Sequence, residues 1–113
     1  MEITKEDVKQ VIKYANENVG EYATPIYPLQ DAIREVLGEE GLDEYKHIKT
    51  ERYEPHRWFI PTDEIMKLGD FYICGAFNDP STEGQVGQPT DVRYYEVEPV
   101  EKTIVIYIKK EQE

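Results

Sequence analysis

The residues best able to hold a ligand in this chain are arginines and aromatic residues near the ends of predicted strands. Three of the four arginines, Arg52, Arg57 and Arg93, lie in the aromatic stretches "RYEPHRWF" and "DVRYY". A guanidinium group and an aromatic face can clamp a flat ring, and arginine also binds phosphate through two parallel hydrogen bonds. Such a combination favours a flat, anionic, nucleotide-like ligand.

Residues 78–91, "NDPSTEGQVGQPTD", form a loop that can bury very little. If a strand at residues 71–77 pairs with one at residues 92–97, this loop joins them and its base gathers their ends. Long loops in compact domains often serve as lids over sites. We therefore expect a ligand site beneath the 78–91 loop, formed by Arg57, Trp58, Phe77, Asn78, Arg93 and Tyr95.

A plainer interpretation of the same residues stays open. Arg57 and Arg93 would then lie across tyrosine and tryptophan faces and neutralise acids such as Glu96, while the loop only connects two strands. Exposed ion pairs of this kind are common and contribute little to stability. The sequence alone does not separate a ligand site from a neutralised surface.

Catalytic and metal-binding patterns are missing. His47, His56 and Cys74 show no spacing of a metal site, and "EGQVGQP" has two glycines but neither a Lys-Ser/Thr pair nor a following helix to cradle phosphate. Cys74 lies in the most apolar stretch, where burial makes a thiol inert. We expect no metal, no cofactor and no catalytic residue, although a small enzyme of another type stays open.

The chain is strongly acidic, with a formal net charge of −11. Residues 1–50 hold eleven acids and six bases (−5), and residues 51–113 hold thirteen and seven (−6), so the acidity is spread over both halves. Such a field repels nucleic-acid backbones, which are bound through lysine and arginine. We therefore expect no direct nucleic-acid binding, and the acidity favours a basic protein partner or mimicry of a nucleic acid instead.

Length and hydropathy indicate one domain spanning residues 1–113. No apolar run reaches the roughly 20 residues of a membrane helix, and "MEITKEDVKQ" does not resemble a signal peptide. The single cysteine, Cys74, allows no internal disulfide. We expect a cytoplasmic protein without a membrane interaction.

The first third predicts two helices. Thr4 can cap the first helix, whose apolar face is followed by Gly20, and Pro28 is placed at the first position of the second helix, which ends at Gly38. "GEEGLDE" then reads as a loop or a ragged helix end. The apolar positions recur at one-face spacing in both helices, through Val8, Val11, Ile12, Ala15 and Val19, and then Leu29, Ala32, Ile33, Val36 and Leu37.

From Tyr45 onward the pattern favours strands. "YKHIKTERY" alternates weakly, "RWFIP" is short and aromatic, and residues 71–77 are apolar at nearly every position, as in a central strand. "PTDEIMKLG" is interpreted as one helical turn or a loop. Residues 92–98 and 102–110 are predicted to form a hairpin, with Ile104, Ile106 and Ile108 buried along one face.

These elements predict an α+β fold in which two N-terminal helices pack on a mainly antiparallel sheet of four or five strands. The first functional hypothesis is a non-catalytic protein that sequesters a nucleotide-like ligand. The alternative is an acidic inhibitor, an immunity or antitoxin-like protein, or a nucleic-acid mimic that blocks a basic partner. The last strand would also offer a second subunit an edge, although its flanking lysines are typical of a protected edge.

Overall fold

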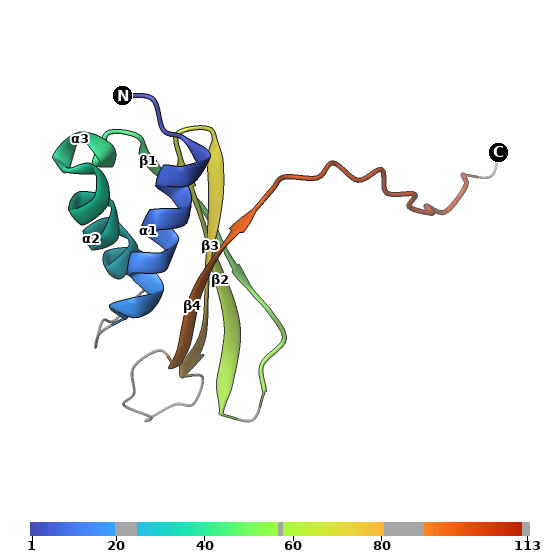
Figure 1. The fold of residues 1–113 in the computed structure, drawn as a ribbon. Coiled ribbons are helices and arrows are strands. Elements are labelled where there is room, and N and C mark those ends of the chain that lie inside the picture. Colours follow the sequence, from blue (N-terminus) through green and yellow to red (C-terminus); the bar gives the residue numbers. More distant parts are fainter. Residues whose placement is uncertain (20–24, 57, 81–89, 112–113) are drawn as a thin grey trace.

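The computed structural model describes residues 1–19, 25–56, 58–80 and 90–111. Gly20, Arg57 and most of the predicted 78–91 loop lie outside these ranges. The elements follow one another as α1 (Lys5–Glu17), α2 (Ile26–Leu37), α3 (Glu39–Leu42), β1 (Tyr45–Arg52), β2 (Phe59–Leu68), β3 (Phe71–Pro80) and β4 (Thr90–Val97). The helices form one layer and the strands a second, and residues 98–111 leave both (Figure 1).

The predicted α+β class is confirmed, with the helices preceding a four-stranded sheet. Its strands lie in the order β1-β2-β3-β4 and every neighbouring pair is antiparallel. A two-residue turn joins β2 to β3, and Gly69 takes its left-handed conformation with a φ of 60°. A Cβ at this position would also lie 2.7 Å from the Cβ of Ile3, so glycine fits both the turn and its packing.

The first helix begins as its sequence predicts. The Thr4 hydroxyl accepts a hydrogen bond from the Asp7 amide at 3.1 Å, and the Asp7 carboxylate accepts one from the Thr4 amide at 2.9 Å. This reciprocal cap satisfies two backbone donors that a helix start leaves unpaired. It fixes α1 with Val8, Val11 and Ala15 buried.

The second helix differs slightly from its prediction. It begins at Ile26, so Pro28 occupies the first turn but not the first position. Proline is tolerated there because the amides of the first turn have no partner within the helix. Gly38 ends the helix as expected, with a φ of 75°, and "GEEGLDE" contains the short helix α3.

One face of the sheet packs against the helices. The core gathers buried residues from α1, α2 and the last three strands, and Tyr94 of β4 spans the layers, because its hydroxyl donates to the carbonyl oxygen of Pro25. The fully buried aliphatic side chains of this face and of the helices include Leu29, Ile33, Met66, Leu68 and Ile73.

Of residues 61–69, which were expected to form a helical turn or a loop, all but Gly69 belong to β2. Thr62, Glu64, Met66 and Leu68 are buried there in alternation with partly exposed neighbours. This period of two is that of a strand. The interpretation from sequence was wrong because two of the four inward positions, Thr62 and Glu64, are polar.

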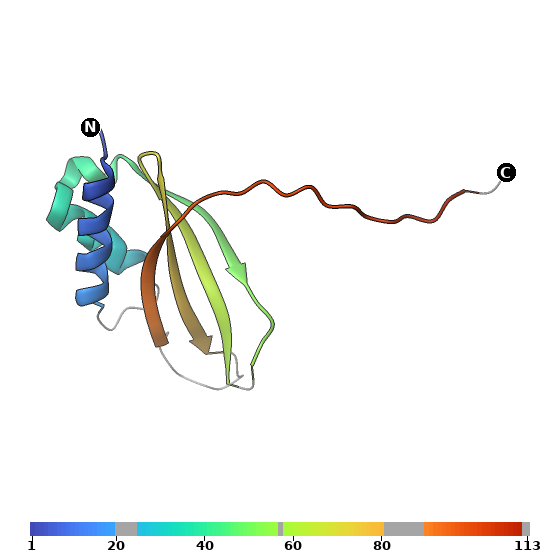
Figure 2. The same ribbon diagram turned by 45° about the vertical axis from the view of Figure 1, so that its right-hand side comes forward.

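The predicted last hairpin is also wrong. Residues 98–111 form no strand, and Ile104, Ile106 and Ile108 are exposed, not buried. The segment extends away from the sheet on the side opposite the helices (Figure 2). The radius of gyration is accordingly 17.6 Å, whereas a compact chain of this length has one of about 13 Å.

Candidate binding face of the sheet

The sheet face that points away from the helices is called the bare face below. No described helix covers it, because α1 packs on β3 and β4 from the other side. Residues directly opposite one another on paired strands share a face. The register therefore places two rows across the bare face, Glu51–Asp63–Ala76–Arg93 and Lys49–Ile65–Cys74–Tyr95.

Two carboxylates lie opposite each other in the first row. Glu51 of β1 and Asp63 of β2 are register partners, and the hydroxyl of Tyr53 donates to Asp63 at 2.8 Å and approaches Glu51 at 3.4 Å. The hydrogen bond to Asp63 raises the pKa of Tyr53, with burial as a lesser cause. Tyr53 therefore stays protonated at neutral pH and serves this acidic pair as a donor.

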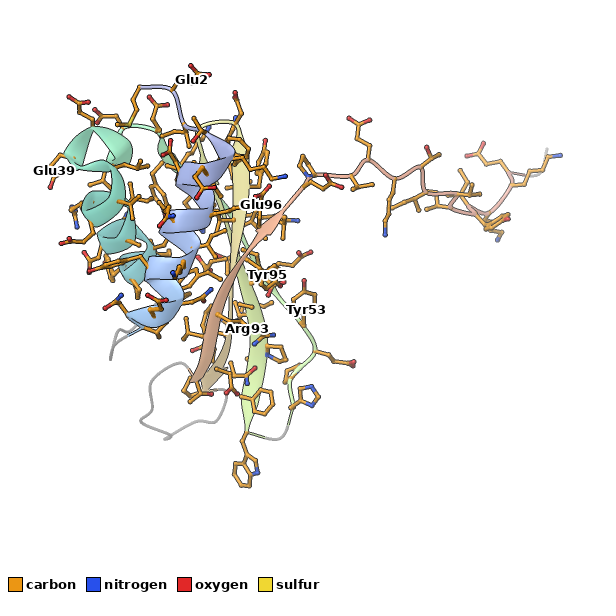
Figure 3. All side chains as sticks on the ribbon, viewed as in Figure 1. Glu2, Glu39, Tyr53, Arg93, Tyr95 and Glu96 are labelled. Carbon is orange, nitrogen blue, oxygen red and sulfur yellow. The ribbon has the colours of Figure 1, made fainter. Side chains whose placement is uncertain are left out.

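The second row holds the thiol of Cys74 next to one aromatic residue, Tyr95. Tyr95 is exposed, and its hydrogen bond with Cys74 followed by burial raises its pKa to about 12. Burial raises the pKa of the Cys74 thiol as well. Figure 3 shows Tyr95 and Tyr53 on the side of the sheet away from the helices. Two exposed rings thus flank the carboxylates, next to an unreactive thiol.

A shallow groove of about 370 Å³ lies beside these rows on the bare face and shares Lys49, Glu51 and Ile65 with them. Its walls come from β1 to β4 and from the first residues after β4. The lining is largely apolar and consists of Ile48, Lys49, Glu51, Ile65, Tyr72, Val97, Glu98, Pro99 and Val100. The bare face therefore has an acidic, aromatic half and an apolar half.

The structure brings together three of the six residues predicted for the ligand site. Asn78, Arg93 and Tyr95 lie on the bare face. The Asn78 amide donates to the Asp91 carboxylate at 2.9 Å, and the Arg93 guanidinium donates to the backbone carbonyl of Asp91 at 3.1 Å. Both side chains are thus oriented by Asp91, which adds a carboxylate to this end of the face.

Phe77 is not part of this group, which corrects the prediction that Phe77 and Arg93 lie together. Phe77 pairs with Thr62 on the face that the helices cover and is only 8% exposed, whereas Arg93 pairs with Ala76 on the bare face. Neighbouring residues of a strand point to opposite faces, so the end of a hairpin does not bring them together. The predicted clamp between this ring and this guanidinium does not exist.

The remaining two residues of the predicted site are not placed with these three. Trp58 is exposed just before β2 begins, and Arg57 lies outside the described residues. The arginine next to this region, Arg52, pairs with Asp79 at 2.9 Å. The cationic group expected at the strand ends is therefore partly neutralised.

Sequence reasoning missed the acidic half of the bare face. Glu51, Asp63 and Tyr53 come from β1, β2 and the residue after β1. The signal that could have found them is the period of two in "PTDEIMKL", which places Asp63 and Ile65 on one face. Their juxtaposition with β1 still required the register.

One further cluster resembles catalytic chemistry but has the wrong geometry. The Nε2 atom of His47 lies 2.8 Å from Glu64 and 3.5 Å from the Thr50 hydroxyl. A nucleophile relay needs the carboxylate and the hydroxyl on different ring nitrogens. Here both contact the same nitrogen, so the histidine compensates the buried Glu64 and does not activate Thr50.

No group of three or more metal-ligating side chains occurs among the residues with a described placement. In the same ranges, no helix is long and apolar enough to cross a bilayer. Comparisons with protein-family models, with curated proteins and with solved structures found no match. The function must therefore be argued from the sheet itself.

Proposed function

We propose that this protein is a non-catalytic interaction protein that binds a basic polypeptide on the acidic, aromatic half of its bare face. The observation that carries the proposal is the opposed pair Glu51 and Asp63, flanked by the exposed rings of Tyr53 and Tyr95. Like charges directly opposite on neighbouring strands destabilise a sheet. A cationic side chain placed between them relieves that repulsion.

The rings strengthen the case for lysine or arginine as the bound group. Cations are attracted to aromatic faces, and tyrosine is enriched at the centres of protein interfaces. Lys49 already lies 3.6 Å from Glu51, but both groups are exposed, so this pair contributes little and is easily exchanged. The local groups thus suit an incoming cation.

The charge of the whole chain supports the same partner. Residues 1–44 hold eleven acids and four bases (−7), and residues 45–113 hold thirteen and nine (−4). Acids such as Glu2 and Glu39 lie in the region of the helices (Figure 3). A field of this sign accelerates the approach of a basic protein. The proposed roles are those of an inhibitor, an immunity or antitoxin-like protein, or a nucleic-acid mimic.

Sequestration of a flat, anionic ligand is the second candidate. It is supported by Asn78, Arg93 and Tyr95, which share the bare face and offer an amide, a cation and a ring. Asp91 and Asp63 stand beside them, however, and repel an anion. The basic polypeptide therefore ranks first.

We place the protein in the cytoplasm, where a free thiol such as Cys74 stays reduced.

Two binding experiments, one with a basic peptide and one with nucleotides, distinguish the two candidates. A short peptide rich in arginine and lysine should bind in a salt-dependent manner, and the double variant Glu51→Gln, Asp63→Asn should weaken it at least about tenfold. The matched control is the double variant Glu39→Gln, Glu40→Gln, which also removes two charges, from exposed acids outside the bare face. Equal losses in both variants would reduce the effect to net charge and overturn the proposed site.

Mono- and cyclic nucleotides test the second candidate by thermal shift. A ligand at about a hundredfold excess over its dissociation constant stabilises a protein by about 2.7 kcal/mol. If nucleotides bind and Arg93→Ala abolishes the shift, while the basic peptide does not bind, ligand sequestration replaces the first candidate.

A further inference from the structure

The segment of residues 102–110, "KTIVIYIKK", has the composition of a strand and no sheet of its own. Ile104, Ile106 and Ile108 are 76%, 74% and 83% exposed, and Tyr107 is 94% exposed. β-branched and aromatic residues at consecutive positions favour a strand with at least one covered face. A patch this apolar on the surface of a protein marks an interaction site.

Within the same chain, the sheet edge nearest to the segment is already occupied by a side chain. The nearest edge in sequence is β4, and there the side chain of Asn16 donates to the backbone carbonyl of Tyr94 at 3.0 Å and accepts from its amide at 2.8 Å. These two backbone groups are the ones an added strand would use at the middle of β4. Asn16 therefore occupies backbone groups that residues 102–110 would need in order to fold back as a hairpin.

The other edge of the sheet is open. β1 is the opposite edge strand, its residues are mostly exposed, and among the described residues β2 is its only strand partner. β1 has eight residues, so at about 3.3 Å per residue it is nearly as long as the nine residues 102–110. The apolar groove begins directly beside it, at Ile48 and Ile65.

Charge favours a second copy of this chain as the source of the added strand. Residues 102–110 carry three lysines and no acid in a protein of net charge −11. The lysines stand at the two ends of the segment, and its centre is uncharged and apolar. The region that receives the segment is neutral, because residues 44–54 hold three acids and three bases. The attraction therefore comes from the rest of the second copy, which has a net charge of −14 once the +3 of its own segment is subtracted from −11.

We propose that residues 102–110 of one chain add as a fifth strand to β1 of a second copy, with Ile104, Ile106 and Ile108 over the apolar half of its bare face. The exchange is reciprocal, because both copies have the same segment and the same edge. Strand addition of this kind gains its affinity from backbone hydrogen bonds and its specificity from alternate side chains. The result is a two-fold dimer.

Reciprocity also gives the contact an adequate size. One added strand of nine residues is small, whereas two exchanged strands with the two edges that receive them approach the roughly 20–30 residues a side of a stable interface. The dimer leaves Asp63 and Tyr95 of the acidic half outside the groove. Glu51, however, lines the groove and also belongs to the acidic pair, so the two proposals share this residue. Ile106→Asp leaves Glu51 unchanged and therefore tests the dimer separately from the binding of a basic polypeptide.

The test is the molar mass of the full chain in solution, measured by light scattering across a range of concentrations. The unaltered protein should form a dimer. Ile106→Asp should weaken the dimer at least about a hundredfold, because it places an unpaired charge in the covered apolar row. The monomer should keep its circular dichroism spectrum, since this side chain is exposed.

Val105→Asp is the matched control. It makes the same chemical change one residue away, on the row that faces solvent in the proposed dimer, and should weaken the dimer less than about tenfold. A chain that is monomeric at every concentration would overturn the proposal. So would a dimer that both variants leave intact, because its contact must then lie elsewhere.

Hydrogen exchange identifies the edge that receives the strand. The amides of β1 should be protected in the dimer and exchange faster in Ile106→Asp, while the amides of β4 should not change between the two proteins. Protection gained on β4 instead of β1 would refute the assignment of the edge even if a dimer forms.

Discussion

β3 and residues 102–110 are both rich in apolar side chains, yet they have opposite surroundings. In β3, residues 73–77 are all buried, on both faces of the sheet. In the C-terminal segment every residue from 102 to 110 is exposed. The two stretches differ little in their preference for strands, so propensity does not explain the difference.

What separates them is the cover that the rest of the chain supplies. β3 lies between β2 and β4, and the helices pack on one of its faces. The C-terminal segment follows a strand whose outer edge is already occupied by Asn16. An apolar pattern therefore shows that a segment needs a cover, but not that its own chain provides it.

The largest expected loss of stability comes from opening a cavity next to β3. Ile73→Ala removes a fully buried side chain and should lower the free energy of unfolding by about 2–4 kcal/mol, since the cavity is only partly filled by its neighbours. Ile106→Ala, the same change in the exposed segment, should alter it by less than about 0.5 kcal/mol. Urea unfolding at a concentration where the chain is monomeric measures both.

A large loss in Ile106→Ala under these conditions would mean that the segment is covered within its own chain. It would contradict the structure as well as the inference of exchange. Similar small losses in both variants would instead show that the core around β3 repacks.

The fold was largely predictable because its local signals agree. Thr4 and Asp7 form the expected cap, Gly38 ends α2, and residues 71–77 read as a central strand by their continuous apolar run. The failure in β2 has a specific cause. Glu64 is only 5% exposed and is compensated by His47, a residue 17 positions away that no local pattern connects to it.

The candidate site was less predictable because it depends on which face each residue takes. Phe77 and Asn78 are neighbours in sequence but lie on opposite faces of the sheet, and only Asn78 shares a face with Arg93. The bulge opposite residues 76–78 of β3 shifts the register of β4 at the same place. A one-residue shift of this kind reverses the face of every residue beyond it.

An intermediate effect should come from the side chain that blocks β4. Asn16→Ala removes two hydrogen bonds to the backbone of Tyr94 and should cost about 1–3 kcal/mol of stability. It also opens the edge, so residues 102–110 can pair with β4 of their own chain. Hydrogen exchange should then show new protection in both segments of the monomer.

Asn18→Ala is the control for this variant. Asn18 also bonds a backbone carbonyl, that of Tyr14, but lies at the exposed end of α1 and away from β4. It should leave the exchange of the C-terminal segment unchanged. If Asn16→Ala leaves that exchange unchanged as well, the blocked edge is not what keeps the segment away from β4.

The smallest change in stability at neutral pH is expected for a residue of β1. This strand is less covered than β3 but more covered than the C-terminal segment. The hydroxyl of Tyr45 is buried and bonds to none of the described residues. Burial, with a lesser contribution from Glu64, raises its pKa from 10.0 to about 12. Because Tyr45→Phe removes a buried group without a partner, it should be neutral or slightly stabilising at pH 7.

The same variant should behave differently in alkali. Below pH 10 the folded and unfolded states both keep the proton on Tyr45, so its ionisation does not affect the free energy of unfolding. Between pH 10 and about 12 the unfolded state releases the proton first, which favours unfolding, so stability falls as pH rises through this window. Urea midpoints at pH 7, 9 and 11 should show a smaller alkaline loss in Tyr45→Phe than in the unaltered protein. An equal loss would assign the alkaline sensitivity to other groups, of which Tyr53 and Tyr95 on the bare face have pKa values raised in the same direction.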